Sequence, residues 1–308
     1  MHPTEVPVLD LAAIRAAFNT HAASLSPDDR ALAHRTFDRL QPPNWTLEWY
    51  LPWWLGHALE LPARVAEAIV LSNVLGLVAI RLEDDLLDGE VTDADRASAR
   101  RISASLLQRA VAIYGPMFDQ ASPFWSYLDR TMFEWRLAAE QRDPAADGRW
   151  WLARRGAPLK VGARAICLLA DRDRDWPAVD RCLDHALASL ALYDDLCDWD
   201  ADLEAGRWNA FVASLVSLAQ APETRRRNRS AVLVALMVDD AASRGFGRVQ
   251  ADALKAAVLA RAIGSPPLAE HLAESAARAA DQGAAVQAHY RAAAHRANEL
   301  LVGATSRA

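Results

Sequence analysis

Long runs of helix-forming residues, separated by prolines and glycines, constrain the fold of this chain more than any other feature. The runs are rich in Ala, Leu and Arg, and strict apolar–polar alternation is scarce. We therefore expect an all-α bundle of about ten helices with no sheet. The separating positions are Pro42-Pro43, Pro62, Gly115-Pro116, Ser122-Pro123, Asp143-Pro144, Gly156 to Pro158, Pro177, Pro222, Gly245 to Gly247 and Ser265 to Pro267.

The connections between these runs are short, and no low-complexity linker divides the chain. We expect a single α-helical domain over residues 1–308, with residues 1–25 as a loosely ordered N-terminal segment. Ser26 and Pro27 combine a cap residue with a first-turn proline, so they predict the start of a helix that reaches Leu40.

Composition favours one large core, because 52% of the residues are apolar and 24% are charged. No apolar run reaches about 18 residues without a charge, so no membrane span is expected. The first residues lack a secretory signal, which makes the cytoplasm the expected location. The net charge of -6 argues against nucleic acid as a partner. Cys167, Cys182 and Cys197 lack metal-binding spacing and are predicted to be reduced core residues.

The first acidic cluster, Asp84-Asp85-Leu86-Leu87-Asp88, ends a helix predicted to run from Pro62 to Glu90. This helix is apolar on almost every face, which is typical of the middle of a bundle. The face of Asp84 and Asp88, followed backwards, carries Ile80, Leu77 and Asn73. We interpret that face as the wall of a deep apolar pocket with a charged rim. Aspartates at a helix C-terminus oppose the helix dipole, so this placement suggests a bound cation.

The second acidic cluster begins 110 residues after Asp84 and contains Asp194, Asp198 and Asp202. These residues are spaced four apart, so one helix would present three carboxylates on consecutive turns. Carboxylates packed this closely repel one another unless a cation neutralises them, and magnesium prefers oxygen ligands. Two such stripes, facing each other, could hold magnesium ions and a phosphate-bearing ligand.

The two clusters together resemble the metal motifs of class I terpene synthases and trans-isoprenyl diphosphate synthases. The first matches the DDxxD motif that both families share. The second has the spacing of the second metal motif, with aspartate at all three ligand positions and Gly206-Arg207 after them. The resemblance is strongest to bacterial-type terpene cyclases. It implies a class I isoprenoid-synthase helical bundle with a central apolar pocket, and a homodimer.

The resemblance also implies an enzyme, a carbon–oxygen lyase that ionises an allylic isoprenyl diphosphate and cyclises the carbocation. Three magnesium ions would bind the diphosphate and stabilise its charge as the bond breaks. Asp84 and Asp88 would ligate two ions, and the aspartates of the second cluster would ligate the third. Asp85 would partner a basic residue.

Basic groups are expected at the outer phosphate oxygens. Lys160 opens an otherwise apolar helix, and Arg207 follows the second cluster directly; Arg154 and Arg155 are weaker choices. Terpene synthases often carry an Arg-Tyr pair near the C-terminus. Here Tyr290 is the corresponding residue, although histidine precedes it.

Two other functions remain open. The chain lacks an early Gly-Lys motif and an arginine pair directly after Asp88, which argues against chain elongation. The same bundle could instead act as a prenyltransferase that passes the allylic cation to an acceptor, or as a non-catalytic helical protein.

The tryptophan-rich segment contains Trp45, Trp49, Trp53 and Trp54. These residues could stabilise a carbocation, but we interpret them as core. Trp199, beside the second cluster, is a better choice for the pocket.

Overall fold

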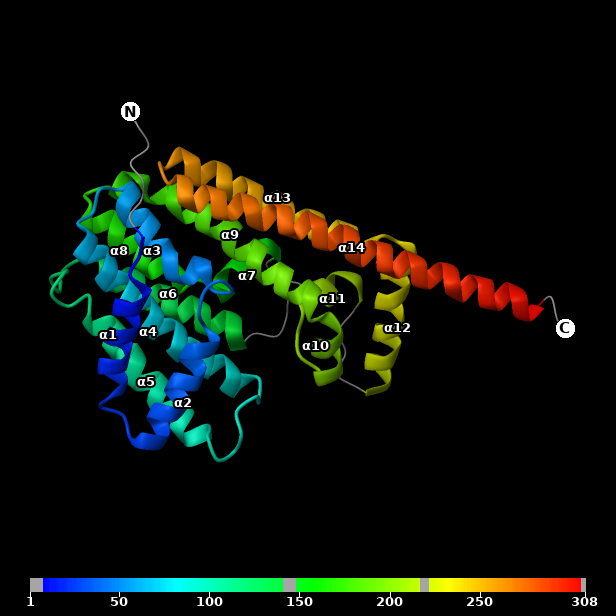
Figure 1. The fold of residues 1–308 in the computed structure, drawn as a ribbon, viewed down its shortest axis with the longest axis horizontal. Coiled ribbons are helices and arrows are strands. Elements are labelled where there is room, and N and C mark those ends of the chain that lie inside the picture. The colour runs from blue at the N-terminus through cyan, green and yellow to red at the C-terminus, as the bar shows by residue number, and fades with distance from the viewer. Residues whose placement is uncertain (1–7, 141–147, 217–221, 306–308) are drawn as a thin grey trace. The chain divides into compact units, whose positions relative to one another are not determined.

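All regular structure in the described part of the chain is helical, and no strand occurs there. This computed structural model describes residues 8–140, 148–216 and 222–305 (Figure 1). The all-α prediction is therefore confirmed. The helices are α1 (Leu11–Ala22), α2 (Pro27–Arg39), α3 (Thr46–Ala58), α4 (Ala63–Leu87), α5 (Arg96–Ala112), α6 (Pro123–Glu140), α7 (Gly148–Arg155), α8 (Leu159–Leu169), α9 (Trp176–Cys197), α10 (Trp199–Ala205), α11 (Ala210–Leu215), α12 (Pro222–Val238), α13 (Ala241–Ala262) and α14 (Pro266–Thr305).

The chain clusters into two compact units. Unit 1 comprises Met1–Glu140, Gly156–Cys182 and Val258–His271, and unit 2 comprises Gln141–Arg155, Leu183–Ala257 and Leu272–Ala308. Helices α9, α13 and α14 contribute residues to both units. The single domain expected from the sequence stays a prediction.

Helix α4 is the central helix of unit 1. It packs against α3 and α5 and also contacts α1, α2, α6 and α8. Val70, Val74, Val78 and Leu82 follow one another at helical spacing, and all four are fully buried in the core of the unit. This arrangement explains why the helix is apolar on almost every face, as the sequence indicated.

The tryptophan-rich segment forms α3 and belongs mainly to the same core. Trp49 is fully buried, and its indole N–H donates to the carbonyl of Leu40 at 2.6 Å. Trp53 is also buried, while Trp45 and Trp54 pack against the core with part of their surface exposed. The interpretation of these four residues as core therefore agrees with the structure.

Unit 2 is held together by contacts among its long helices. Ser189 of α9 donates to the carbonyl of Val249 in α13 at 3.0 Å, and Gln287 of α14 donates to Leu236 in α12 at 3.0 Å. Helices α13 and α14 run side by side (Figure 1), and a Cβ added at Gly283 would lie 2.6 Å from Phe246. The short helices α10 and α11 contact α12.

Several expectations about the helices need correction. Residues Gly245 to Gly247 lie inside α13 instead of breaking it. Gly245 faces α9, where a Cβ would lie 2.6 Å from Leu196, so this glycine permits close helix packing. Asp10 caps α1 through a 2.9 Å bond from the amide of Ala13, so residues 11–22 of the segment predicted as loose are helical.

Three further expectations concern the start of α2, the number of helices and the cysteines. Ser26 caps α2 as predicted, with Pro27 in its first turn. The described part of the chain has more helices than the roughly ten expected, because it includes the short helices α7, α10 and α11, each of eight residues or fewer. Cys167 and Cys182 are buried, but Cys197 at the end of α9 is exposed, so the prediction of three core cysteines was wrong for Cys197.

Candidate functional site

The first acidic cluster lies at the C-terminus of α4 in unit 1. Asp84 is half-buried in the last turn, and Asp88 is the exposed residue that caps the helix. The amide of Asp88 donates to the carbonyl of Asp84 at 2.9 Å, so the two residues remain one turn apart. Their carboxylates therefore share one side of the helix end, as the spacing predicted.

Asp85, between them, is buried and held by two arginines. Arg39 of α2 approaches its carboxylate to 2.9 Å, and Arg81, one turn earlier on α4, approaches to 2.8 Å. Arg81 also lies 3.4 Å from Glu90. Asp85 thus has the basic partners that we expected for it, and they fix the end of α4 against α2.

The rest of this face of α4 is more accessible to solvent than the opposite side of the helix. Asn73, Leu77 and Ile80 keep part of their surface accessible, whereas the core-facing residues are fully buried. The Nδ2 atom of Asn73 lies 3.5 Å from the carbonyl oxygen of Glu48 in α3. A Cβ at Gly162 of α8 would lie 2.7 Å from the Oδ1 atom of Asn73, so this glycine makes room for the amide.

Glu48, whose backbone carbonyl lies near Asn73, also carries a titratable carboxyl. Burial raises the pKa of Glu48 from 4.5 to about 7, against the opposing effect of a bond from its own backbone. No sequence pattern marks Glu48, because a glutamate near a helix N-terminus is usually a solvated residue that interacts favourably with the helix dipole.

A hollow in unit 1 lies elsewhere. It is on the surface of α5 and is lined by Ser105, Gln108, Arg109 and Ala112. None of these is a predicted site residue, so the central apolar pocket stays a prediction.

The second acidic cluster lies at the junction of α9 and α10 in unit 2. Asp194 is exposed in the last turn of α9, Asp198 is the exposed residue between the helices, and Asp202 lies in α10. The amide of Asp198 donates to Asp194 and that of Asp202 to Asp198, both at 2.9 Å. The three residues therefore follow one another by single turns, although the continuous helix that we expected is interrupted at Asp198.

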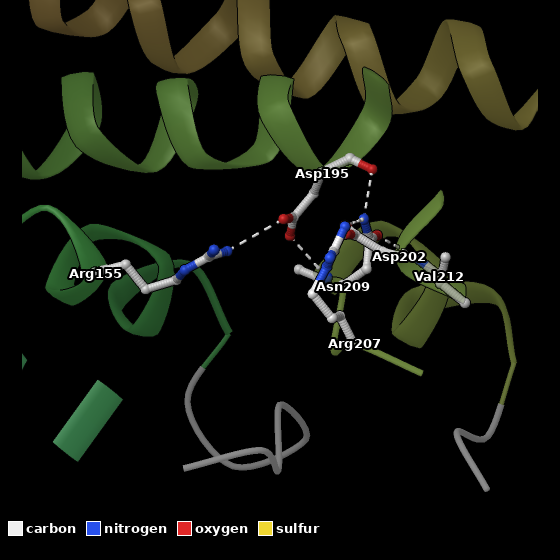
Figure 2. Close-up of polar contacts among 7 residues, drawn as sticks. Arg155, Asp195, Asp202, Arg207, Asn209 and Val212 are labelled. Atoms are coloured by element: carbon white, nitrogen blue, oxygen red, sulfur yellow. Dashed lines mark hydrogen bonds and ion pairs between the residues drawn. The ribbon is translucent and has the colours of Figure 1, made fainter. Parts of the chain in front are cut away.

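Asp195 is the buried residue of this cluster and joins three segments of unit 2 (Figure 2). Arg155 of α7 donates to one carboxylate oxygen at 3.1 Å, and the amide of Ala210 donates to the other at 2.7 Å. The Nδ2 atom of Asn209 donates to the Asp195 carbonyl at 2.7 Å. Burial raises the pKa of Asp195, while Arg155 and the Ala210 amide oppose this effect.

Asp202 is likewise held by its neighbours. Arg207 donates to one carboxylate oxygen at 2.9 Å and Asn209 donates to the other at 2.8 Å. Gly206 ends α10 with a φ of 71°, a left-handed conformation that favours glycine, and the amide of Arg207 then donates to the Asp202 carbonyl at 2.8 Å. This turn brings the side chain of Arg207 to Asp202 (Figure 2).

Tyr290 and Trp199 are brought together within unit 2. Trp199 is buried at the start of α10, and its hydrogen bond to Tyr290 lowers the tyrosine pKa, although burial raises that pKa by more. Asp200, next along the chain, accepts two bonds of 2.7 Å from Arg229 in α12. The residue predicted from the Arg-Tyr pattern thus contacts Trp199, which directly follows Asp198 of the second cluster.

The other predicted basic residues have different surroundings. Lys160 of α8 lies in unit 1, where it donates to Asp180 at 2.8 Å. Arg155 pairs with Asp195, as described above, and Arg154 is exposed beside it on α7. Lys160 and the arginines of α7 therefore belong to different units.

Arg39 and Asn209 contact the clusters but were not among the predicted site residues. Arg39 lies 46 residues before Asp85, and nothing in its local sequence distinguishes it from a surface arginine. Asn209 carried a usable signal, because an asparagine directly before a short apolar helix is a typical cap. Its Oδ1 atom accepts from Val212 at 3.0 Å.

Magnesium fits the carboxylate donors of these clusters better than a metal whose ligands must all come from the protein. Among the residues described, no three His, Cys, Asp or Glu side chains group closely enough to hold a metal ion. Asp202 is instead bonded to Arg207 and Asn209. Magnesium, however, is usually bound by one or two carboxylates with waters and substrate phosphates. The turn-spaced pairs Asp84 with Asp88 and Asp194 with Asp198 offer such ligands.

One helix in the described part of the chain is long and apolar enough to cross a membrane. It is α4, and half of its most apolar stretch is buried inside the protein. The core helix of a soluble protein has the same properties, so this is only a weak indication. The absence of a membrane span stays a prediction.

Comparisons with protein-family models, with curated proteins and with solved structures found no match for this chain.

Proposed function

We propose that the protein is a magnesium-dependent class I terpene cyclase. It would ionise an allylic isoprenyl diphosphate, cyclise the carbocation to a terpene hydrocarbon or alcohol, and release diphosphate. One observation carries the proposal: two aspartate clusters with turn-spaced carboxylates, each of which contains a buried aspartate held by arginine. Solvated acidic residues on a protein surface do not need such support. Here the buried aspartate and its arginine hold the backbone that carries the more exposed carboxylates.

Carboxylates of both clusters would serve as magnesium ligands. Asp84 and Asp88 from one cluster, and Asp194 and Asp198 from the other, would bind magnesium. Bound magnesium would neutralise the charge that develops on the diphosphate as its bond to carbon breaks.

Arginines and buried aspartates would keep these ligands in position. Arg39 and Arg81 hold Asp85 and so fix the end of α4, and Arg155 holds Asp195 beside the second cluster. Asp202 would join the second set of ligands by exchanging Arg207 for a cation. Arg207, once released, would be available to the phosphate oxygens.

The hydrocarbon chain would lie along α4. The accessible face of Asn73, Leu77 and Ile80 leads to Asp84 at spacings of three and four residues. Asn73 is eleven residues before Asp84, or about 16 Å along a helix. An apolar wall of this length below a magnesium site suits an isoprenoid chain.

The test is incubation of the purified protein with magnesium and, separately, geranyl, farnesyl or geranylgeranyl diphosphate. Gas chromatography with mass spectrometry should show a volatile product from at least one of them. The product should disappear with a chelator and fall by about a hundredfold or more in Asp84→Ala, because magnesium stabilisation of the leaving group is lost. Asp93→Asn is the matched control, since the Asp93 side chain is almost fully exposed.

Other products would contradict the cyclase assignment. Only the hydrolysed alcohol, or no reaction, would indicate a prenyltransferase that needs an acceptor. A longer isoprenyl diphosphate in the presence of isopentenyl diphosphate would indicate chain elongation.

A further inference from the structure

Two buried indole N–H groups of unit 2 have no acceptor. They belong to Trp151 of α7 and to Trp208, which lies between α10 and α11. Trp151 is only 5% exposed. Among the described residues no hydrogen-bond partner lies within reach of either nitrogen. Buried donors are almost always satisfied in folded proteins, so each of these groups needs an explanation.

Packing of the two rings against each other can satisfy at most one of the two N–H groups. Their centroids are 4.2 Å apart and their planes meet at 80°, which is an edge-to-face pair. In such a pair the edge of one ring points at the face of the other. One N–H group can therefore rest against a ring face, but the two groups cannot both do so.

The indole pair lies beside the second acidic cluster. Trp208 lies between Arg207 and Asn209, both of which donate to Asp202. Trp151 is one helical turn before Arg155, which donates to Asp195. The same two segments, α7 and residues 207–210, thus contact Asp195 from two sides and also carry the two indoles.

An indole nitrogen can only donate, so it cannot ligate a cation. We propose that at least one of Trp151 and Trp208 donates a hydrogen bond to an oxyanion of the phosphate class bound beside the second acidic cluster. This inference rests on the proposed function, in which that oxyanion is the diphosphate of the substrate. Phosphate oxygens are strong acceptors, and the contact would supplement the arginines of the same two segments.

Nuclear magnetic resonance of the intact protein provides the first test. Labelling with ¹⁵N-tryptophan gives one indole signal for each of the eleven tryptophans, and single Phe variants assign them. Inorganic diphosphate with magnesium should move the Trp151 or Trp208 proton, or both, downfield by several tenths of a part per million. Trp125 is the internal control, because its indole already donates to Asp119 at 2.7 Å. Binding of diphosphate that shifts other signals but neither of these indoles would overturn the inference.

A calorimetric titration with inorganic diphosphate and magnesium provides the second test. Replacement of each tryptophan by benzothienylalanine keeps the ring shape and removes only the N–H group. We expect affinity to fall by about tenfold to a hundredfold at the position that contacts the anion, the effect of losing a hydrogen bond to a charged acceptor. Unchanged affinity at both positions would mean that water or the ring face satisfies these groups, and would overturn the inference.

These tests separate the inference from the proposed function. Indole shifts with diphosphate but no product from any allylic diphosphate would contradict the cyclase and leave the oxyanion contact intact. Product formation without indole shifts would support the cyclase and contradict the oxyanion contact. Inorganic phosphate forms the second arm of the titration; weaker binding than diphosphate would identify the two-phosphate ligand as the preferred one.

Discussion

At the scale of single residues, Asp85 shows how a predicted site can also be a structural element. It is buried while its two arginine partners are partly exposed. Asp85→Asn removes the charge that pairs with both, and we expect the free energy of unfolding to fall by about 1–2 kcal/mol, since solvent screens part of the loss. Urea denaturation at pH 7 measures this change.

The control for this prediction is Asp38→Asn. Asp38 pairs with Arg15 at 2.9 Å, but both side chains are about half exposed. An exposed pair contributes little, so a change below about 0.5 kcal/mol is expected. Equal effects at the two positions would show that the burial of Asp85 is unimportant.

Glu48 predicts a pH dependence of stability. Its pKa in the folded protein is about 7, above the usual value of 4.5. The folded state therefore holds the proton more tightly, so stability contributed by Glu48 is fully present below pH 4.5 and is lost as the pH rises through 7. The full shift would correspond to about 3 kcal/mol, but the side chain keeps some accessible surface, so we expect about 1–2 kcal/mol.

The measurement is the unfolding free energy of the parent and of Glu48→Gln between pH 4.5 and 8. The parent should lose stability relative to the variant across this window. A constant difference would show that Glu48 is ionised in the folded protein throughout, and so is not desolvated.

At the scale of helices and turns, both acidic clusters end in the same structure. Gly89 has a φ of 72° and Gly206 a φ of 71°. In each turn the amide after the glycine donates at 2.8 Å to the carbonyl of an aspartate whose side chain is held by arginine, Asp85 or Asp202. The turn therefore fixes both the helix end and the carboxylate.

Gly206→Ala tests this turn. A left-handed conformation costs alanine about 1–2 kcal/mol relative to glycine, so stability should fall by that amount. Gly247→Ala is the matched control, because Gly247 is an exposed glycine inside α13 with open space around it. There alanine should stabilise the helix by about 0.5–1 kcal/mol. Equal destabilisation at the two positions would contradict the role of the turn.

Helix prediction succeeded where the signal was local and failed where packing decided. Ser26 with Pro27 predicts the start of α2, and the apolar run after Pro62 predicts α4. Glycine disfavours helices, so Gly245 predicts a break. Its position against Leu196 shows instead that the absence of a side chain lets α13 approach α9. That contact joins residues far apart in sequence, so no local pattern could reveal it.

At the scale of the whole molecule, sequence spacing could predict which carboxylates share a helix face but not their partners. Asp84 and Asp88 are one turn apart because the helix repeat requires it. The pairing of Asp195 with Arg155, 40 residues earlier, depends on where α7 packs. Asp202 was expected to be a metal ligand from spacing alone, and the turn at Gly206 brings Arg207 to it instead.

The proposed function requires both clusters to contribute to the binding of diphosphate, which can be tested on the intact protein. Inorganic diphosphate with magnesium, at about a hundred times its dissociation constant, should stabilise the protein by about 2.7 kcal/mol. Asp84→Asn and Asp198→Asn should each reduce this stabilisation. The double variant completes a double-mutant cycle, which measures whether the two losses are independent.

Thermal unfolding of the four proteins, with and without the ligand, measures this coupling. Chelation of magnesium should remove the stabilisation from the parent and leave the double variant unchanged. Full stabilisation of a single variant would mean that its cluster takes no part in binding, and a metal-independent stabilisation would mean that the arginines alone hold the anion. Either result would contradict the proposed magnesium-dependent binding, because magnesium would hold the diphosphate through the carboxylates of the clusters.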